Sequence, residues 1–250
     1  MNALSPIDNQ FIDGLKFCAF AYDLFEKIAS DVDGVSRIRM RNSIVEKKLI
    51  EELLPICKYI QAKYRTGRYI SVCWKSGNQN HDAEIIQSGA YIDQGYYHQQ
   101  AFLEITSAVH PKDYLSRELL NKQGFAFSAD GLKRQKDGSI KSEPIVHTNY
   151  VYIERFSEIL LARIKDKASK RYPDHTTLIV CCCLDMLCTS EEWEYLRRCI
   201  EKSQQSHQFE EIYIYETTHE FSFSLWGSSS SNNFEYRTET IANNNEYPQP

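Results

Sequence analysis

The spacing of apolar residues changes along the chain, and each change predicts a different kind of element. Residues 9–29 carry apolar side chains at roughly helical spacing, which predicts an amphipathic N-terminal helix. A second helix is expected from Ser43 to about Tyr64, where Pro55 removes one backbone donor and should kink or break it. Gly67 is expected to end this helix.

The apolar period then falls from about 3.6 residues to 2, which is the period of a strand. Three such runs are rich in β-branched and aromatic residues, namely RYISVCW (68–74), HDAEIIQ (81–87) and QAFLEIT (100–106). Glycines mark the expected turns, at Gly77, Gly89 and Gly95. We therefore predict a three-stranded meander.

The second half of the chain alternates helical and strand patterns. After a long connection (107–149) that holds a possible short helix, the pattern predicts a helix at 151–172, an uninterrupted apolar strand at 175–187, a helix at 191–202 and a strand at 209–216. A capping box of Thr189 and Glu192 begins the later helix. A strand without polar alternation is typical of a sheet that is covered on both faces.

The order helix, three-strand meander, helix, strand, helix, strand predicts an α/β fold with a mixed central sheet flanked by helices. The chain has 250 residues, of which 42% are hydrophobic and 12% aromatic, enough to bury one full core. We expect a single α/β domain over residues 1–227. The tail, residues 228–250, has little to bury and is expected to be disordered.

Cysteine usage and the N-terminal residues indicate a cytoplasmic protein. The longest apolar run near the N-terminus, Phe17 to Tyr22, is too short for a secretory signal or a membrane span. Without a secretory segment, the eight cysteines are expected to be free thiols. The CCCLDMLC stretch also lacks a second Cys/His pair at the spacing of a zinc finger.

The charge distribution bears on nucleic-acid binding. A net charge of −5 argues against a protein that coats nucleic acid nonspecifically, because that binding depends on clustered cations. One local basic segment, LKRQKDGSIK (132–141), has a charge of +3 from one acid, Asp137, and four cations, Lys133, Arg134, Lys136 and Lys141. Its Asp-Gly pair is typical of a type I′ hairpin turn. The hairpin could grip a phosphate backbone or be a solvated surface element.

Two acids in the meander are candidates for metal binding. Asp82 begins the second predicted strand and Glu104 lies inside the third. If these strands pair, the two carboxylates could converge at one end of the sheet. Carboxylate oxygens suit Mg²⁺, and a bound Mg²⁺ could polarise a phosphodiester and lower the pKa of its water.

With this order of elements, the two acids resemble the motif of the PD-(D/E)XK, or restriction-endonuclease-like, nuclease superfamily. That superfamily has a core helix before three strands, then a helix and another strand. The resemblance covers about residues 43–184, with 107–149 as an insertion. His81-Asp82 stands where the family has Pro-Asp, and Glu104-Ile105-Thr106 stands where it has Glu-X-Lys.

The resemblance implies a Mg²⁺- or Mn²⁺-dependent endonuclease that acts on DNA or RNA. Asp82 and Glu104 would be the metal ligands, and Glu46 or Glu51 on the preceding helix would be an additional acid. The hairpin 132–141 would contact the nucleic acid. Many nucleases of this fold are dimers, so a homodimer is compatible with the resemblance, and no membrane partner is expected.

The sequence departs from the family at the motif lysine. Thr106 stands at the position of this lysine, and the resemblance would make it a catalytic residue. An uncharged hydroxyl cannot stabilise developing negative charge as a lysine does. The resemblance then requires a lysine from elsewhere, and the candidates are Lys75, Lys112 and Lys165. His110, after the third strand, could approach a substrate phosphate. The alternative is a catalytically inactive nuclease-fold protein that acts as a binding module.

Overall fold

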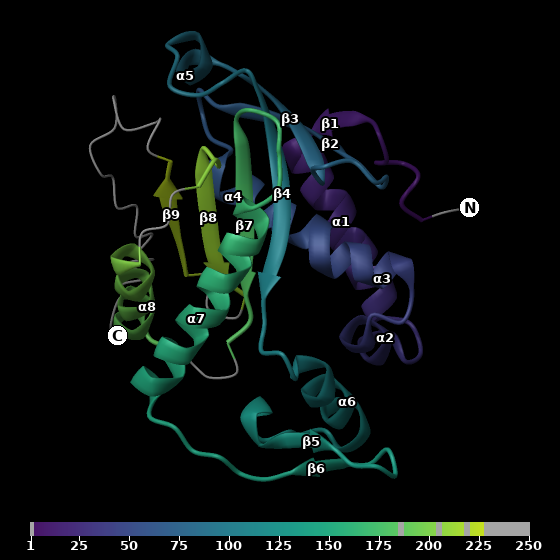
Figure 1. Cartoon of the computed structure of the whole chain (residues 1–250). Helices are drawn as coiled ribbons and strands as arrows, with labels where there is room; N and C mark the ends of the chain where they lie inside the picture. The colour runs from purple at the N-terminus through teal and green to yellow at the C-terminus, as the bar shows by residue number, and fades with distance from the viewer. Residues whose placement is uncertain (1–2, 185–187, 204–206, 218–220, 228–250) are drawn as a thin grey trace, which may run out of the picture.

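A seven-stranded sheet lies at the centre of the computed structural model, which describes residues 3–184, 188–203, 207–217 and 221–227 (Figure 1). In spatial order its strands are β1 (Phe11–Asp13), β2 (Tyr69–Trp74), β3 (Ala83–Ser88), β4 (Gln100–Ala108), β7 (Thr176–Cys182), β8 (Glu211–Glu216) and β9 (Ser222–Trp226). Strands β2, β3 and β4 are antiparallel, β4, β7 and β8 are parallel, and β9 is antiparallel to β8. The predicted meander and the mixed sheet are confirmed.

Helices cover both faces of the sheet, as the sequence predicts. The described α-helices are α1 (Gly14–Ala29), α2 (Gly34–Met40), α3 (Ile44–Lys48), α4 (Leu54–Lys63), α5 (Ala90–Asp93), α6 (Asp113–Gln123), α7 (Asn149–Ala168) and α8 (Ser190–Lys202). Helices α1 and α4 pack on one face of the sheet, and α7 and α8 pack on the other (Figure 1). The described part of the chain is thus a three-layer α/β/α arrangement.

Strand alternation divides the buried residues between two cores. On β4, Leu103 and Ile105 join the core beneath α1 and α4, whereas Ala108 joins the core beneath α7 and α8. Every residue of β7 is buried, because this strand lies in the middle of the sheet and is covered on both faces. A polar side chain on β4 must therefore find its partners within one of these two layers.

The second predicted helix contains a local change in helical pitch. A π-helical turn, η1 (Leu49–Leu53), separates α3 from α4, and Pro55 lies in the first turn of α4. Because proline has no N–H, the preceding turn cannot keep a regular α-helical ladder. The helix ends at Lys63 rather than at Gly67, which instead occupies the following turn with φ of 86°.

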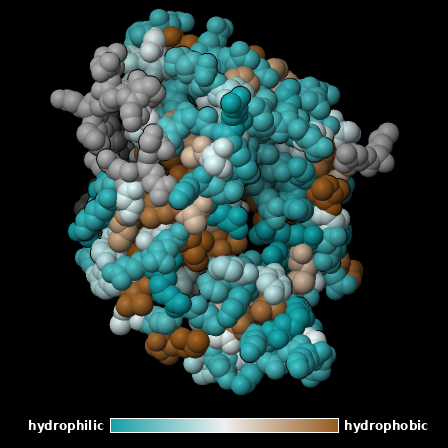
Figure 2. Space-filling view, viewed as in Figure 1, coloured by the Kyte–Doolittle hydropathy of each residue, from teal (hydrophilic) through white to brown (hydrophobic). Residues whose placement is uncertain are grey.

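A small subdomain lies beyond the end of β4. It consists of α6, a 3₁₀ turn (Ala129–Gly131) and the hairpin of β5 (Leu132–Arg134) and β6 (Ile140–Ser142), packed around Leu115, Leu119 and Leu132. The hairpin is confirmed, but the type I′ turn is wrong, because only Gly138 and not Asp137 has a positive φ. Figure 2 shows hydrophobic residues in the lower part of this face, where α6, α7 and the hairpin lie.

Several expectations concern cysteines, membranes and the C-terminal tail. All eight cysteines are free thiols, as predicted. Among the described helices, none is both long and apolar enough to cross a membrane. The predicted disordered tail, 228–250, lies outside the described residues. The sequence pattern missed two short edge strands, β1 and β9, because strands of three and five residues carry little periodicity.

Candidate metal centre around Asp82 and Glu104

Asp82 lies immediately before β3 and is held against β4 by two hydrogen bonds. Its backbone N–H donates to the carbonyl oxygen of Leu103 at 2.9 Å, and its carboxylate Oδ2 accepts from the N–H of Ile105 at 2.8 Å. Leu103 and Ile105 flank Glu104 in the sequence. The meander therefore brings Asp82 beside Glu104, although 22 residues separate the two acids.

Glu104 lies on β4 with its side chain directed toward α7. Its neighbours Leu103 and Ile105 point into the opposite core, so alternation along the strand gives Glu104 the α7 face. There its Oε1 accepts from Nζ of Lys167 at 2.5 Å and from the hydroxyl of Tyr172 at 3.4 Å. The Glu104 side chain is only 10% exposed, so this ion pair is largely shielded from water.

A third acid, Glu52, approaches from the π-helical turn. Its carboxylate accepts from Nε1 of Trp74 at 3.0 Å and from Nζ of Lys48 at 2.5 Å. Burial raises the pKa of Glu52, and the negative charge of Asp82 raises it further. The charge of Asp82 therefore acts on Glu52, although no hydrogen bond joins the two carboxylates in the described part of the chain.

The electrostatic balance of the site disfavours a charged Asp82. Burial, followed by the negative charge of Glu104, raises the pKa of Asp82 to about 6. The hydrogen bond from Ile105 and the cations Lys167 and Lys48 act in the opposite direction but do not cancel these effects. A pKa raised in this way by burial and a neighbouring charge is typical of a functional carboxylate.

The two acids offer oxygen atoms, the ligand type that a hard divalent cation prefers. Among the described residues, hydrogen bonds reach only one oxygen of each carboxylate, Oδ2 of Asp82 and Oε1 of Glu104. The second oxygen of each acid accepts no hydrogen bond there and is available as a ligand. Mg²⁺ is usually held by one or two carboxylates, with water and phosphate oxygens in its other positions.

The additional acid predicted on the preceding helix is not the one that faces the site. Glu51 pairs with Arg41 at 2.5 Å instead. Glu46 forms the capping box of α3 and pairs with Arg37 at 2.6 Å. Glu52 is instead the acid of this helix on which the charge of Asp82 acts, and it lies within the π-helical turn, where side chains depart from regular α-helical directions.

The candidate lysines also lie elsewhere. Nζ of Lys112 donates to the carbonyl oxygen of Asp130 at 2.8 Å, and no contact joins Lys112 to Asp82 or Glu104 in the described part of the chain. Lys75 lies 3.8 Å from Glu84, and Lys165 is exposed. Thr106 lies on β4 opposite Val180 and is partly buried. Lys167, which is absent from the predicted set, is the lysine that reaches Glu104.

The predicted nucleic-acid contacts lie on the β5–β6 hairpin, and two of them have acidic partners. Arg134 pairs with Glu118 and Lys141 with Glu143, each at 2.5 Å. The other two hairpin cations, Lys133 and Lys136, are exposed. His110, which precedes this subdomain, contacts Asp130 at 3.2 Å rather than Glu104.

Comparison with known proteins gives no family for the chain. No protein-family model matches it, and neither a curated protein nor a solved structure matches it. The candidate function therefore depends on the local geometry of Asp82, Glu104 and Lys167.

Proposed function

We propose that the chain is a metal-dependent nuclease with a restriction-endonuclease-like core, which hydrolyses phosphodiester bonds in DNA or RNA with Mg²⁺ or Mn²⁺. The observation that carries this proposal is the ammonium group of Lys167, 2.5 Å from Glu104, beside an Asp82 whose pKa is raised. The element order supports it: the α3–α4 helix, the β2–β3–β4 meander, α7 and β7 follow the order of that superfamily.

In this proposal, Asp82 and Glu104 hold the divalent ion through their available oxygens. A bound Mg²⁺ would polarise the scissile phosphate and lower the pKa of its water. Glu52 is the additional acid, since its charge already interacts with that of Asp82. All three carboxylates are partly or largely shielded from water, which strengthens their interaction with a cation.

Lys167 replaces the motif lysine that the sequence lacks at Thr106. Its ammonium reaches Glu104 from the last turn of α7, whereas the motif lysine would extend from β4 itself. From this position it can orient a water molecule or stabilise negative charge on the phosphate in the transition state. The nearby hydroxyl of Tyr172 fixes the same Glu104 oxygen.

A catalytically inactive binding module is the second candidate, and one observation favours it. Lys167 already neutralises Glu104, so the carboxylate has a satisfied partner without any metal. In that case the ion pair would serve only to hold α7 against β4. The same fold would then bind nucleic acid without cleaving it.

Cleavage assays separate the two candidates. The purified chain is incubated with supercoiled plasmid, linear duplex, single-stranded DNA and RNA in Mg²⁺, Mn²⁺ or chelator. The nuclease proposal expects metal-dependent cleavage of at least one substrate that is lost in both Asp82→Asn and Glu104→Gln. Glu51→Gln is the matched control, because Glu51 is paired with Arg41 and should leave activity unchanged. Metal-independent binding without cleavage, equal in parent and variants, would establish the binding module.

A further inference from the structure

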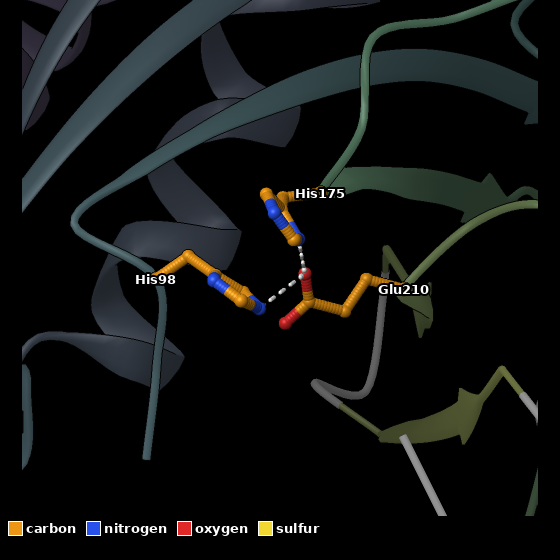
Figure 3. Close-up of side chains that lie close together, drawn as sticks. All are labelled: His98, His175 and Glu210. Carbon is orange, nitrogen blue, oxygen red and sulfur yellow. Dashed lines mark hydrogen bonds and ion pairs between the residues drawn. The ribbon is translucent and has the colours of Figure 1, made fainter. Parts of the chain in front are cut away.

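Two histidines and a glutamate meet where three strands of the sheet begin. His98 precedes β4, His175 directly precedes β7, and Glu210 directly precedes β8, and Figure 3 shows both imidazoles directed toward one carboxylate oxygen. Nδ1 of His175 lies 3.0 Å and Nε2 of His98 lies 3.7 Å from Oε2 of Glu210. In the described part of the chain, this is the group of three potential metal ligands whose donor atoms all lie within 4.8 Å of one another.

We propose that His98, His175 and Glu210 form a Zn²⁺ site. Zn²⁺ binds imidazole nitrogen and carboxylate oxygen at about 2.0–2.2 Å, so neighbouring ligand atoms of a tetrahedral site lie roughly 3.4 Å apart. The two distances to Glu210, 3.0 and 3.7 Å, bracket that value. Small side-chain rotations would bring the three donor atoms around one ion.

The two imidazole rings lie against each other, and one of them must tilt out of the stack for both to bind the same ion. They are stacked with 3.4 Å between their centroids and 22° between their planes. His175 has a positive φ of 61°, a conformation that few non-glycine residues adopt, and its carbonyl accepts from the N–H of Phe102 on β4. Backbone strain of this kind is often found where a side chain must be aimed at a ligand. The backbone conformation of His175 thus helps to direct its imidazole toward Glu210.

The surroundings leave room for a fourth ligand. The three residues line a small cavity of about 10 Å³, which has room for about one water molecule but not for a nucleotide. Arg68 lines the same cavity, and its buried Nη1 has no hydrogen-bond partner among the described residues. A water molecule or hydroxide on the metal would offer that N–H an acceptor. Three protein ligands with one open position are typical of zinc sites that activate water.

A second His-Asp-His cluster shows what a similar arrangement looks like when an arginine occupies it. Asp130 contacts His110 and His147, but Nη1 of Arg155 lies 2.6 Å from Asp130 and 2.8 Å from His147. The guanidinium already supplies the positive charge, so a metal would have to displace it. No such cation contacts the Glu210 carboxylate in the described residues, where the two histidines are its partners.

The proposed zinc site is independent of the proposed nuclease site. The proposed zinc ligand His98 lies just before Gln100, the first residue of β4. Glu104 lies four residues further along the strand than Gln100, which corresponds to about 13 Å at roughly 3.3 Å per residue. The ligand types differ as well, because imidazole favours Zn²⁺ whereas carboxylates alone favour Mg²⁺. Each site can therefore be tested in a variant of the other.

The test is a Zn²⁺ titration of the full chain in competition with a chromogenic chelator, followed by thermal unfolding. We expect one tightly bound Zn²⁺ that raises the unfolding temperature. His98→Ala, His175→Ala and Glu210→Gln should each weaken binding by at least about tenfold, because loss of even a residue that only supports a metal ligand costs about 10- to 100-fold in affinity. Glu210→Gln keeps the shape of the side chain, and circular dichroism will verify that each variant is folded.

Two controls separate this site from other possible zinc ligands. His147→Ala removes a histidine from the arginine-occupied cluster, and Asp82→Asn removes the proposed Mg²⁺ ligand; both should bind Zn²⁺ like the parent. The Co²⁺-substituted chain should show d–d absorption without a thiolate charge-transfer band, because none of the proposed ligands is a cysteine. Absence of Zn²⁺ binding, unchanged affinity in all three ligand variants, or a thiolate band would overturn the proposal.

Discussion

Lys167 on α7 and Glu104 on β4 form an ion pair with 2.5 Å between Nζ and Oε1, across 63 residues of sequence. The two side chains are only 17% and 10% exposed. Removing two charges from water costs desolvation energy, and an apolar pair of similar volume would hold α7 against β4 without that cost. The pair is therefore expected to add little net stability, which is compatible with its role in the proposed site.

Replacing Lys167 should separate catalysis from nucleic-acid binding. If the proposed nuclease mechanism holds, Lys167→Met removes the group that would stabilise transition-state charge, and we expect the cleavage rate to fall about 10²- to 10³-fold, the usual effect of removing one such donor. Substrate affinity should change little, because a single cation contributes little to backbone binding. Single-turnover cleavage and gel-shift binding of the same duplex measure the two quantities.

The matched control for that experiment is Lys165→Met. Lys165 is on the same helix, carries the same charge and is exposed, so the variant should cleave at the parental rate. Lys167→Arg keeps the positive charge and should retain the fold while still cleaving more slowly, because the planar guanidinium cannot occupy the same position as an ammonium. Equal cleavage rates in the parent and Lys167→Met would show that Lys167 has no role in catalysis.

Asp82→Asn should stabilise the chain while abolishing cleavage. The amide oxygen can still accept from Ile105, but the buried charge that Glu104 opposes is gone. A pKa raised from 3.8 to about 6 corresponds to a gain of about 1 to 3 kcal/mol in the free energy of unfolding above pH 6. Chemical denaturation near neutral pH, with chelator present, measures this gain.

The pH dependence of that gain has a definite sign. Between about pH 4 and 6 the folded state holds a proton on Asp82 that the unfolded state has released, so the free energy of unfolding falls as the pH rises through this window. Asp82→Asn removes this contribution, and the stability difference should therefore shrink toward zero near pH 4. A difference that stays constant with pH would mean that the carboxylate is already ionised throughout.

The sequence pattern predicted the sheet better than the site. The sequence predicts that Asp82 lies at the start of one strand and Glu104 within the next, and the structure confirms these positions, because strand alternation and the meander depend on local hydrophobic pattern. Lys167 was missed because its approach to β4 depends on how α7 packs on the sheet, a tertiary relationship with no local periodic pattern. Lys165, two residues away on the same helix, was in the predicted set.

The acids that the sequence offers on the first core helix, Glu46 and Glu51, each have an arginine partner in the structure. An α-helix that continued unbroken to Pro55 would give each residue a regular direction, but Glu51 and Glu52 lie inside the π-helical turn, whose extra residue changes the directions of their side chains. Glu52 then reaches Asp82 and Trp74, while Glu51 pairs with Arg41. The His98, His175 and Glu210 cluster was missed because its members lie in three separate loops.

Binding of Mg²⁺ should strengthen as the pH rises through about 6. The ion competes with the proton for Asp82, and the carboxylate becomes predominantly ionised only above its raised pKa of about 6. We therefore expect the apparent Mg²⁺ affinity to increase about tenfold per pH unit below pH 6 and to level off above it. Calorimetric titration at several pH values measures this, and the dependence should disappear in Asp82→Asn.

The two adjacent glutamates of the π-helical turn provide a matched comparison. Glu52→Gln removes a charge that interacts with Asp82, so we expect the Mg²⁺ concentration for half-maximal cleavage to rise about tenfold, a common cost of removing a supporting carboxylate. Glu51→Gln should leave it unchanged, because that side chain is paired with Arg41. A larger effect of Glu51→Gln than of Glu52→Gln would instead support Glu51 as the additional acid, as the sequence predicts.

The β5–β6 hairpin should contribute to nucleic-acid affinity through its exposed lysines rather than through its paired cations. Lys133 and Lys136 are exposed, whereas Arg134 and Lys141 contact acids. A Lys133→Ala, Lys136→Ala double variant should weaken binding to all sequences and reduce the slope of log affinity against log salt by about 2, because each lysine would neutralise one phosphate. The matched double variant with Arg134→Ala and Lys141→Ala should change that slope less. Both are measured by fluorescence anisotropy of a labelled duplex across a salt series, and an unchanged slope in the first variant would place the hairpin outside the nucleic-acid interface.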